Sequence, residues 1–425
     1  MNYQDKKSIG IEPLVYSPMN LLLLAEVSAA AVLGGAERVL REQALGLRKR
    51  GHDVRIVARA PASDLRPQVA VSDLIEHRYA VSRRNEPAFV LSSLVRSVKA
   101  FDQARALLSL DAVIIHQSLA GFGAILRRRA QARTWVYMCL SLAHEEYLSR
   151  TPPPITSLDS LRRTLNAKVR RWIERVVMNR CVRVAVLSQF MWERVLAVHR
   201  IPKDKLRMVT GAADPDRFRP PDDPVAVREQ LKLPLNRVVL FTVRNLVPRM
   251  GLENLLRAIA TLGKEGRDLL LVIGGEGPLR STLEQLIRDL GLSDRARLVG
   301  FIAEDDLSRY YQAADLVLIP THQLEGFGLV TVEALACGTP VLGTPVGAIP
   351  EVLARVDPGL LADGTDGAAL ATAIRRILRQ FRDQPGEQER LSVKGRALVE
   401  QDYTWDRHSE QLDRILHETC PSSTK

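Results

Sequence analysis

Short apolar runs alternate with longer amphipathic segments along most of the chain. The amphipathic segments with helical spacing include 35–50, 252–262, 279–290 and 307–313. The apolar runs predict strands at 21–24, 54–58, 112–116, 134–138, 183–187, 238–243, 269–273, 297–299, 316–319 and 340–342. Nearly continuous apolar strands separated by helices are typical of a parallel sheet covered on both faces.

This alternation occurs twice, which predicts two doubly wound α/β domains. Prolines and charges cluster between the two series at Arg217–Pro224, as in a linker. A length of 425 residues is also more than one typical hydrophobic core can organise. In open α/β sheets ligands bind at the carboxyl ends of the strands, so two facing domains would form a binding cleft.

The composition fits a globular enzyme in a reducing compartment. Hydrophobic residues make up 46% of the chain and charged residues 26%. The four cysteines are scattered and contain no C-x-x-C pair, which argues against a disulfide or zinc framework. The apolar segment Leu21–Leu33 is interrupted by Glu26 and is too short to span a bilayer, so we interpret Asn20–Glu26 as a buried first strand rather than a targeting segment. We therefore expect a cytoplasmic protein.

The net charge of +11 is distributed unevenly. Residues 1–220 contain 36 Lys and Arg against 20 Asp and Glu, whereas residues 221–425 contain 24 against 29. An anionic membrane, a nucleic acid or an acidic substrate could meet the basic first half. Nucleic acid is the least favoured, because aromatic residues are only 5% of the chain and no reader motif is present.

One segment of the basic half, 161–180, has its own apolar stripe. Arginines surround this stripe, which consists of Leu161, Leu165, Val169, Trp172 and Val176. The pattern has two interpretations, a helix lying on an anionic membrane surface or a packed helix with a solvated basic face. The second is the commoner cause. The first would place the protein at the inner face of a membrane.

Three glycine-containing turns precede predicted helices and could receive an anion. They lie at 33–37, 273–280 and 325–328. Glycine lets backbone N–H groups approach a phosphate closely, and a helix N-terminus favours negative charge. Each turn is also compatible with an ordinary structural role. None matches the G-x-x-x-x-G-K-[ST] phosphate loop, so a nucleoside triphosphatase is not favoured.

The third turn belongs to the segment Glu325–Glu333, which reads EGFGLVTVE. If 329–336 is helical, Glu333 lies about two turns beyond Glu325 on a similar bearing. A carboxylate, backbone amides and a second carboxylate in this order suit the sugar, the diphosphate and the ribose of a nucleotide sugar. An amphipathic helix with a solvated Glu333 and a capping Glu325 is the alternative.

The surrounding run 311–351 closely resembles the signature of retaining glycosyltransferases of family 4. The resemblance covers about residues 20–416, and it includes the motifs GGAER at 34–38, VLSQF at 186–190, GAADPDRFRP at 211–220, GGEGP at 274–278 and YTW at 403–405. It implies the GT-B fold, with two Rossmann-like domains facing across a cleft. The implied domains are an acceptor-side domain at 1–217, to which 403–425 crosses back, and a nucleotide-sugar domain at 218–402.

The resemblance also implies roles for individual residues. Glu325 would contact hydroxyl groups of the donor sugar, and Glu333 would bind the ribose. His116 would lie near the reacting sugar; a histidine satisfied by the backbone at a strand end is the alternative. Backbone and loop positions would hold the rest of the donor, namely Gly34, Gly35, Gly275, Glu276, Phe327, Gly328 and Leu329.

One motif departs from the family. The usual pattern resembles G-R-L-V-P-E-K-G, with an arginine and a lysine for the diphosphate, whereas residues 243–251 read VRNLVPRMG. Asn245 and Met250 stand at the arginine and lysine positions. Arg244 and Arg249 keep the same mutual spacing one place earlier, and the planar guanidinium is a good diphosphate ligand. We predict that these two arginines take over the task.

The expected activity is transfer of a hexose of mannose or glucose type to a glycan, polysaccharide or lipid-linked acceptor. The donor would be a UDP- or GDP-sugar, and the fold usually works without a metal. The D-x-D spelling at 214–216 lies in the linker motif, where a turn is expected. Two other functions remain open, a nucleotide-sugar 2-epimerase and a binding scaffold that has lost catalysis, which the departure at Asn245 and Met250 motivates.

Overall fold

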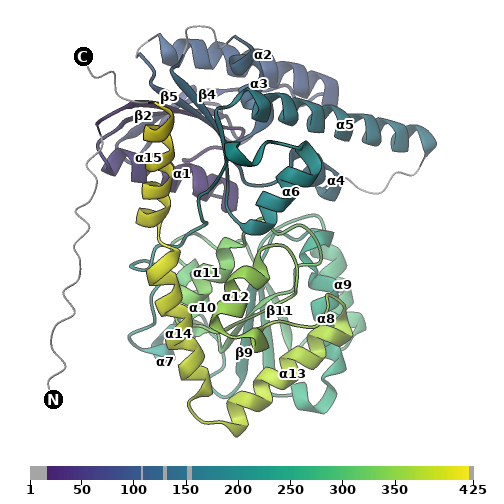
Figure 1. The fold of residues 1–425 in the computed structure, drawn as a ribbon. Helices are drawn as coiled ribbons and strands as arrows, with labels where there is room; N and C mark the ends of the chain where they lie inside the picture. The colour runs from purple at the N-terminus through teal and green to yellow at the C-terminus, as the bar shows by residue number, and fades with distance from the viewer. Residues whose placement is uncertain (1–16, 107–108, 128–131, 151–155, 421–425) are drawn as a thin grey trace, which may run out of the picture.

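The computed structural model describes residues 17–106, 109–127, 132–150 and 156–420, and it contains two sheets (Figure 1). The first sheet has eight strands in the order β3-β4-β2-β1-β5-β6-β7-β8. They are β1 (Asn20–Leu24), β2 (Asp53–Arg59), β3 (Gln68–Val71), β4 (Leu74–Tyr79), β5 (Ala112–Ile115), β6 (Thr134–Cys139), β7 (Arg183–Val186) and β8 (Leu206–Met208). All neighbouring strands are parallel except β3 and β4.

Six helices accompany the described part of the first sheet. They are α1 (Gly35–Lys49), α2 (Glu86–Arg105), α3 (Ser118–Leu126), α4 (Ala143–Arg150), α5 (Ser157–Arg180) and α6 (Gln189–His199). The central strand β1 shows why the layers form. Leu21 and Leu23 point into the core that contains the apolar face of α1, whereas Leu22 and Leu24 point into the core that contains Phe101 of α2. Because successive side chains point to opposite faces, an all-apolar strand supplies buried apolar side chains to both faces of the sheet.

The second sheet is fully parallel and has the order β11-β10-β9-β12-β13. Its strands are β9 (Val238–Val243), β10 (Leu269–Gly274), β11 (Ala296–Gly300), β12 (Leu316–Ile319) and β13 (Val341–Gly343). The helices of this part are α7 (Pro224–Gln230), α8 (Leu252–Thr261), α9 (Arg280–Asp289), α10 (Leu307–Ala313), α11 (Leu329–Ala336), α12 (Ile349–Val356), α13 (Gly367–Asp383) and α14 (Glu387–Asp402). Short 3-10 turns are η1 (Lys203–Lys205), η2 (Pro248–Met250), η3 (Gly263–Gly266) and η4 (Pro358–Leu360).

The last helix, α15 (Trp405–Thr419), returns to the first sheet and packs beside α1 (Figure 1). Its buried Asp413 accepts a hydrogen bond from His52 at 3.0 Å, and its buried His408 contacts Gln43 of α1 at 2.8 Å. The chain thus passes between the two parts twice, once after β8 and once before α15. The residue at which one domain ends and the next begins stays a prediction.

The predicted α/β class and all ten predicted strands are confirmed, with differences of one or two residues at their ends. The strands β3, β4 and β8 were not predicted. In β4 the cause is a pair of charged residues, because Glu76 and Arg78 are buried there, and charged side chains argue against a buried strand. Glu76 accepts hydrogen bonds from Ser28 and from the backbone of Ala29, both at 2.6 Å, which stabilises its charge inside the protein.

Helix α5 is packed, but not through the apolar stripe that its sequence shows. Its buried residues are Ala167, Ile173, Glu174, Val177 and Met178. Of the stripe, Leu161, Leu165, Val169 and Trp172 are exposed, by 64%, 60%, 42% and 58% respectively. The outer end of α5 extends past the neighbouring helices (Figure 1). None of the described helices combines the length and the apolar character needed to cross a membrane.

Candidate functional site

The carboxyl-end loops of the two sheets face each other. Gly35 follows β1, and a Cβ placed on it would lie 3.6 Å from Leu329, the first residue of α11. Ser188 follows β7, and its hydroxyl donates a hydrogen bond of 2.6 Å to the carbonyl of Gly326. Because both sheets present the edge where α/β folds bind ligands, this contact region is the expected place for a site.

Arg244 and Glu325 come together at this edge. Arg244 follows β9 directly and is buried, with 7% of its surface exposed. Its guanidinium donates hydrogen bonds to the Glu325 carboxylate and to the hydroxyl of Thr321, and Thr321 in turn contacts Glu325 at 3.3 Å. Asn245 and Met250 stand at the positions of the family's arginine and lysine. Asn245 is exposed and Met250 is buried, so neither takes the place of Arg244 beside Glu325.

Arg249, the second predicted arginine, holds the loop that precedes Glu325. Its Nη1 donates a hydrogen bond of 2.7 Å to the carbonyl of Leu324, and its own carbonyl accepts one of 2.8 Å from the backbone of His322. Leu324 has a φ of 56°, a conformation that a leucine seldom adopts. The contacts of Arg249 therefore belong to the structure that presents Glu325.

The predicted donor-side loop lies against Arg244 and requires glycine. Gly275 follows β10 with a φ of 121°, and a Cβ there would lie 1.9 Å from the carbonyl oxygen of Arg244. No other residue type fits this close approach. The neighbouring Glu276 points its carboxylate to Arg280 at 2.7 Å, and about half of that side chain is exposed. In this conformation Glu276 contacts helix α9 rather than Glu325.

Glycine also begins α11. Gly328 is the residue before the helix and has a φ of 81°, and the unpaired N–H groups of a helix N-terminus favour an anion. Gly34 stands at the same place before α1, in an extended conformation. The side chain of Phe327 turns away from this point, because it is buried against Gly211 and Tyr403. Its predicted contribution is through the backbone alone.

Glu333 is buried in a network that sequence reasoning missed. The Tyr311 hydroxyl donates a hydrogen bond of 2.9 Å to Oε2, and the guanidinium of Arg38 from α1 forms an ion pair with Oε1. Burial alone would lower the pKa of Arg38, but the adjacent Glu333 raises it. Burial and the same carboxylate hold the pKa of Tyr311 well above its ordinary value. Arg38 therefore stays charged and links α1 to α11.

A second carboxylate strengthens the same junction. Glu304 lies after β11 and receives Arg41 of α1 at 2.8 Å and Arg217 at 2.7 Å, while Nε of Arg38 is 3.7 Å away. Burial alone would raise the pKa of Glu304, but the hydrogen bond from Arg217 lowers it. Three cations from the basic half thus meet two acidic side chains of the other half.

His116 does not contact the other predicted site residues in this structure. It is 2% exposed, and its Nε2 lies 2.5 Å from Oε1 of Gln43. The amide nitrogen of Gln43 contacts Nε2 of His408, whose Nδ1 lies 2.5 Å from the carbonyl of Thr210. Burial lowers the pKa of His116 to about 3 and that of His408 to about 4, so both imidazoles are neutral at pH 7. Neutral rings allow one consistent direction of donation, from His116 to Gln43 to His408 to Thr210.

A carboxylate of the second sheet also caps a helix of the first. Glu351 of α12 accepts hydrogen bonds from the backbone N–H groups of Gln189 at 2.8 Å and Phe190 at 2.7 Å, which are the first residues of α6. Arg38, Ser188 and Glu351 all lie inside motifs recognised in the sequence. Their membership of those motifs was the available signal, but the partner of each comes from a distant part of the chain.

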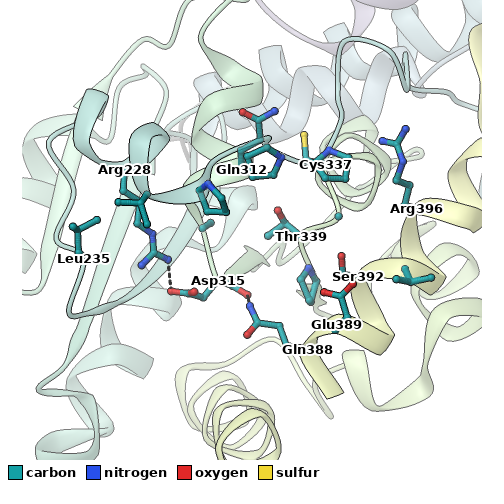
Figure 2. Close-up of a pocket in the computed structure, with 18 residues that line it drawn as sticks. Arg228, Leu235, Gln312, Asp315, Cys337, Thr339, Gln388, Glu389, Ser392 and Arg396 are labelled. Atoms are coloured by element: carbon teal, nitrogen blue, oxygen red, sulfur yellow. Dashed lines mark hydrogen bonds and ion pairs between the residues drawn. The ribbon is translucent and has the colours of Figure 1, made fainter. Parts of the chain in front are cut away.

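A cavity of about 490 Å³ lies elsewhere (Figure 2). Its lining includes Asp315 and Pro340, which directly precede β12 and β13, and Arg396 of α14. It therefore opens at the amino ends of these strands, the edge opposite to Glu325. An ion pair of 2.7 Å between Arg228 and Asp315 spans part of its wall (Figure 2). Its position separates it from the candidate donor site.

Known proteins resemble both halves of the chain. The family model described as glycosyltransferase family 4 matches residues 33–217, and the model described as glycosyl transferases group 1 matches residues 226–418. A D-inositol 3-phosphate glycosyltransferase from Acidothermus cellulolyticus is 28% identical, with 91% of this chain and 86% of the relative covered. A GDP-mannose-dependent phosphatidylinositol monomannoside mannosyltransferase from Mycolicibacterium smegmatis is 31% identical; the match covers 51% of this chain and 57% of that relative.

Solved structures give the same fold. A sucrose-phosphate synthase from Thermosynechococcus elongatus superposes with a TM-score of 0.79 at 24% identity, covering 94% of this chain and 98% of the other. HepE from Anabaena, solved with UDP-glucose, superposes with a TM-score of 0.74 at 19% identity, covering 94% and 100%. With two family models that together match nearly the whole chain, and with two facing parallel α/β sheets, the protein belongs to the family 4 glycosyltransferases of the GT-B fold, enzymes that act on nucleotide sugars.

Proposed function

We propose that this glycosyltransferase moves a hexose of mannose or glucose type, with retention at the anomeric carbon, from a UDP- or GDP-sugar to a glycan, polysaccharide or lipid-linked acceptor. The observation that carries the proposal is the contact of Arg244 with Glu325 at the carboxyl edge of the second sheet. This contact puts a cation for the diphosphate beside a carboxylate for the sugar hydroxyls. A relative named for a phosphatidylinositol monomannoside acceptor supports a lipid-linked acceptor.

The donor would extend along α11. Glu325 accepts hydrogen bonds from the hexose, and the N–H groups of Phe327, Gly328 and Leu329 together with Arg244 and Arg249 hold the diphosphate. Glu333 accepts the ribose hydroxyls. Gly34 and Gly35 leave room for the donor on the opposite wall, and Gly275 and Glu276 form the donor-side loop.

In the reaction, the bond between the anomeric carbon and the oxygen of the β-phosphate breaks, and its electron pair leaves with the diphosphate. The acceptor oxygen forms the new bond on the same face of the sugar, and its proton passes to a β-phosphate oxygen of the departing diphosphate. Arg244, Arg249 and the α11 amides stabilise the charge that develops on the leaving group. We assign no covalent nucleophile and no metal to this step. We place His116 near the reacting sugar, where burial keeps its imidazole neutral by lowering its pKa.

We further propose the division of the chain into an acceptor domain, 1–217 with 403–425, and a donor domain, 218–402. The position of Arg38, Arg41 and Arg217 against Glu304 and Glu333 supports a junction between these two parts. We place the reaction in the cytoplasm, where nucleotide sugars serve as donors, and at the inner face of the membrane when the acceptor is lipid-linked.

The stereochemical course can be tested without knowing the acceptor. Proton NMR would follow slow donor hydrolysis with UDP-glucose and GDP-mannose, each an α-linked donor. We expect one donor to release the free sugar as its α anomer before mutarotation, and Arg244→Met and Glu325→Gln to slow the release at least about a hundredfold, since each loses a charged contact to the transition state. The β anomer as first product would refute retention. Formation of an epimeric sugar would favour the epimerase function. No turnover of either donor would favour a binding scaffold that has lost catalysis.

A further inference from the structure

The exposed stripe of α5 is a continuous apolar line on one side of a long helix. Leu158, Leu161, Leu165, Val169 and Trp172 follow one another at spacings of three and four residues, which places them on one face. The helix has 24 residues and is therefore about 36 Å long. Each of the five side chains is more than 40% exposed. Scattered exposed leucines are ordinary, but an aligned series with a tryptophan marks an interaction surface.

The buried face of α5 excludes a simple packing explanation. Ala167, Ile173, Val177 and Met178 already attach the helix to the body of the protein, on the side away from the stripe. The ring of Trp172 lies 5.6 Å from that of Phe122 of α3, yet more than half of its surface remains open. The helix therefore has two apolar faces, and the stripe is the one that the described part of the chain leaves uncovered.

Basic side chains border the stripe on both sides. With 100° per residue, Arg162 lies about 60° to one side of the stripe, and Lys168 and Arg175 lie about 60° to 80° to the other. All three are exposed, and none forms an ion pair with an acidic residue in the described part of the chain. The arginines nearer the buried face are engaged otherwise; Arg163, for example, donates a hydrogen bond of 2.7 Å to the carbonyl of Leu148. Cations that border an apolar stripe match a surface whose anionic groups lie just above an apolar layer.

We propose that the outer face of α5 docks on an anionic lipid membrane, with the stripe in the headgroup–acyl boundary and Arg162, Lys168 and Arg175 at lipid phosphates. An amphipathic helix of this composition binds in the plane of the interface, through buried apolar area and attraction to anionic lipid. A tryptophan with a partly polar ring suits that depth. The surface lies in the basic half of the chain, and the proposal does not depend on which sugar the donor carries.

The test is co-sedimentation of the full chain with vesicles of phosphatidylcholine alone and of phosphatidylcholine with phosphatidylglycerol. We expect binding to the anionic vesicles, with much less binding to the neutral ones and a marked loss in high salt. Leu161→Ser/Leu165→Ser should weaken binding about a hundredfold, because each leucine contributes on the order of a tenfold change in the partition constant. Trp172 emission should shift to the blue on binding, and Trp172→Phe should remove that shift.

Matched controls distinguish binding through this surface from nonspecific binding through other exposed residues. Leu65 and Ile75 are exposed by 64% and 53% in the same basic half but near β3 and β4, at the far edge of the sheet. Leu65→Ser/Ile75→Ser should bind like the wild type. A second pair of variants tests the charge. Changing Arg162, Lys168 and Arg175 together to Gln should abolish the preference for anionic vesicles. The same change at three exposed basic residues of the second half, Arg257, Lys264 and Arg267, should leave that preference intact.

Three outcomes would overturn the proposal. They are no binding to anionic vesicles by the full chain, equal losses for the α5 and control variants, and a stripe that serves self-association instead. Light scattering detects the last as a concentration-dependent dimer that Leu161→Ser/Leu165→Ser dissociates while vesicle binding is absent. Circular dichroism of each variant confirms that it is folded before its binding is interpreted.

Discussion

Two guanidinium groups oppose two carboxylates at the proposed donor site, Arg244 at Glu325 and Arg38 at Glu333. For the first pair only the arginine could be anticipated, because Arg244 keeps the spacing to Arg249 that the family motif has; its contact with Glu325 could not. The second could not, since Arg38 and Glu333 are 295 positions apart and no local pattern relates them. The residues of each motif could therefore be predicted from the sequence, whereas the contacts between motifs could not.

The Arg38–Glu333 pair permits a prediction about stability. Glu333 is fully buried, so removing its cation leaves an uncompensated charge in the interior. Arg38→Ala should lower the free energy of unfolding by about 3 kcal/mol. Arg38→Met/Glu333→Gln removes both charges at similar volume and should restore most of that loss. Urea unfolding of the two singles and the double gives the coupling energy. A loss below about 1 kcal/mol for Arg38→Ala would show that the pair is not formed in solution.

The neutral histidines predict a pH dependence. His116 and His408 have pKa values of about 3 and about 4 in the folded protein, against 6.5 for an ordinary histidine. Between these values and pH 6.5 the unfolded chain binds more protons than the folded one, so stability should fall as pH falls from 7 to 5. His408→Gln keeps a donor and an acceptor and should reduce that slope by up to one proton, or about 1.4 kcal/mol per pH unit. An unchanged slope, measured by urea unfolding at each pH, would contradict the buried neutral His408.

At the scale of elements, the strands and helices that carry the site were predictable because their apolar periodicity is strong. Helix α11 begins at Leu329, as its glycine turn indicates. The edge strands β3 and β8 were not predictable, since each has only one buried residue and so lacks the apolar run of the inner strands. The sequence also could not show which face of α5 is buried. Its stripe of leucines looks like a core face, and only the packing of Ile173 and Val177 shows otherwise.

The contact between α12 and α6 gives a prediction at this scale. Glu351 caps α6 across the two sheets, and the residue before α12 also holds the loop of Glu325, since Ala348 N–H donates to the Glu325 carbonyl at 3.1 Å. Glu351→Ala should cost about 1 kcal/mol of stability and should also raise the KM for the donor. Donor hydrolysis kinetics and urea unfolding measure the two effects.

A matched control is Asp366→Ala, which removes the cap of α13 through its contact to the N–H of Ala369 at 2.8 Å. This variant should lose similar stability without a change in KM. If both variants changed KM equally, the effect would be one of general destabilisation. The contact between α6 and α12 would then have no special part in donor binding.

At the scale of the whole molecule, the excess positive charge of the first half lies in two different places. Part of the positive charge of the first half faces inward, where Arg38, Arg41 and Arg217 meet carboxylates of the second half. Another part faces outward on α5. The prediction of an anionic partner from charge alone could not separate these two uses, because a net charge carries no direction. The structure separates them by showing which arginines already have carboxylate partners.

Whether Arg244 and its neighbours form a working donor site can be measured by a thermal-shift titration with UDP and GDP. A ligand that binds only the folded state raises stability by RT ln(1 + [L]/Kd), about 2.7 kcal/mol at a hundredfold excess over Kd. We predict that one nucleotide raises the unfolding midpoint of the wild type, and that Arg244→Met and Glu333→Ala, each compared with its own unliganded midpoint, lose most of that rise. No rise with either nucleotide, or an undiminished rise in both variants, would contradict the donor site described here.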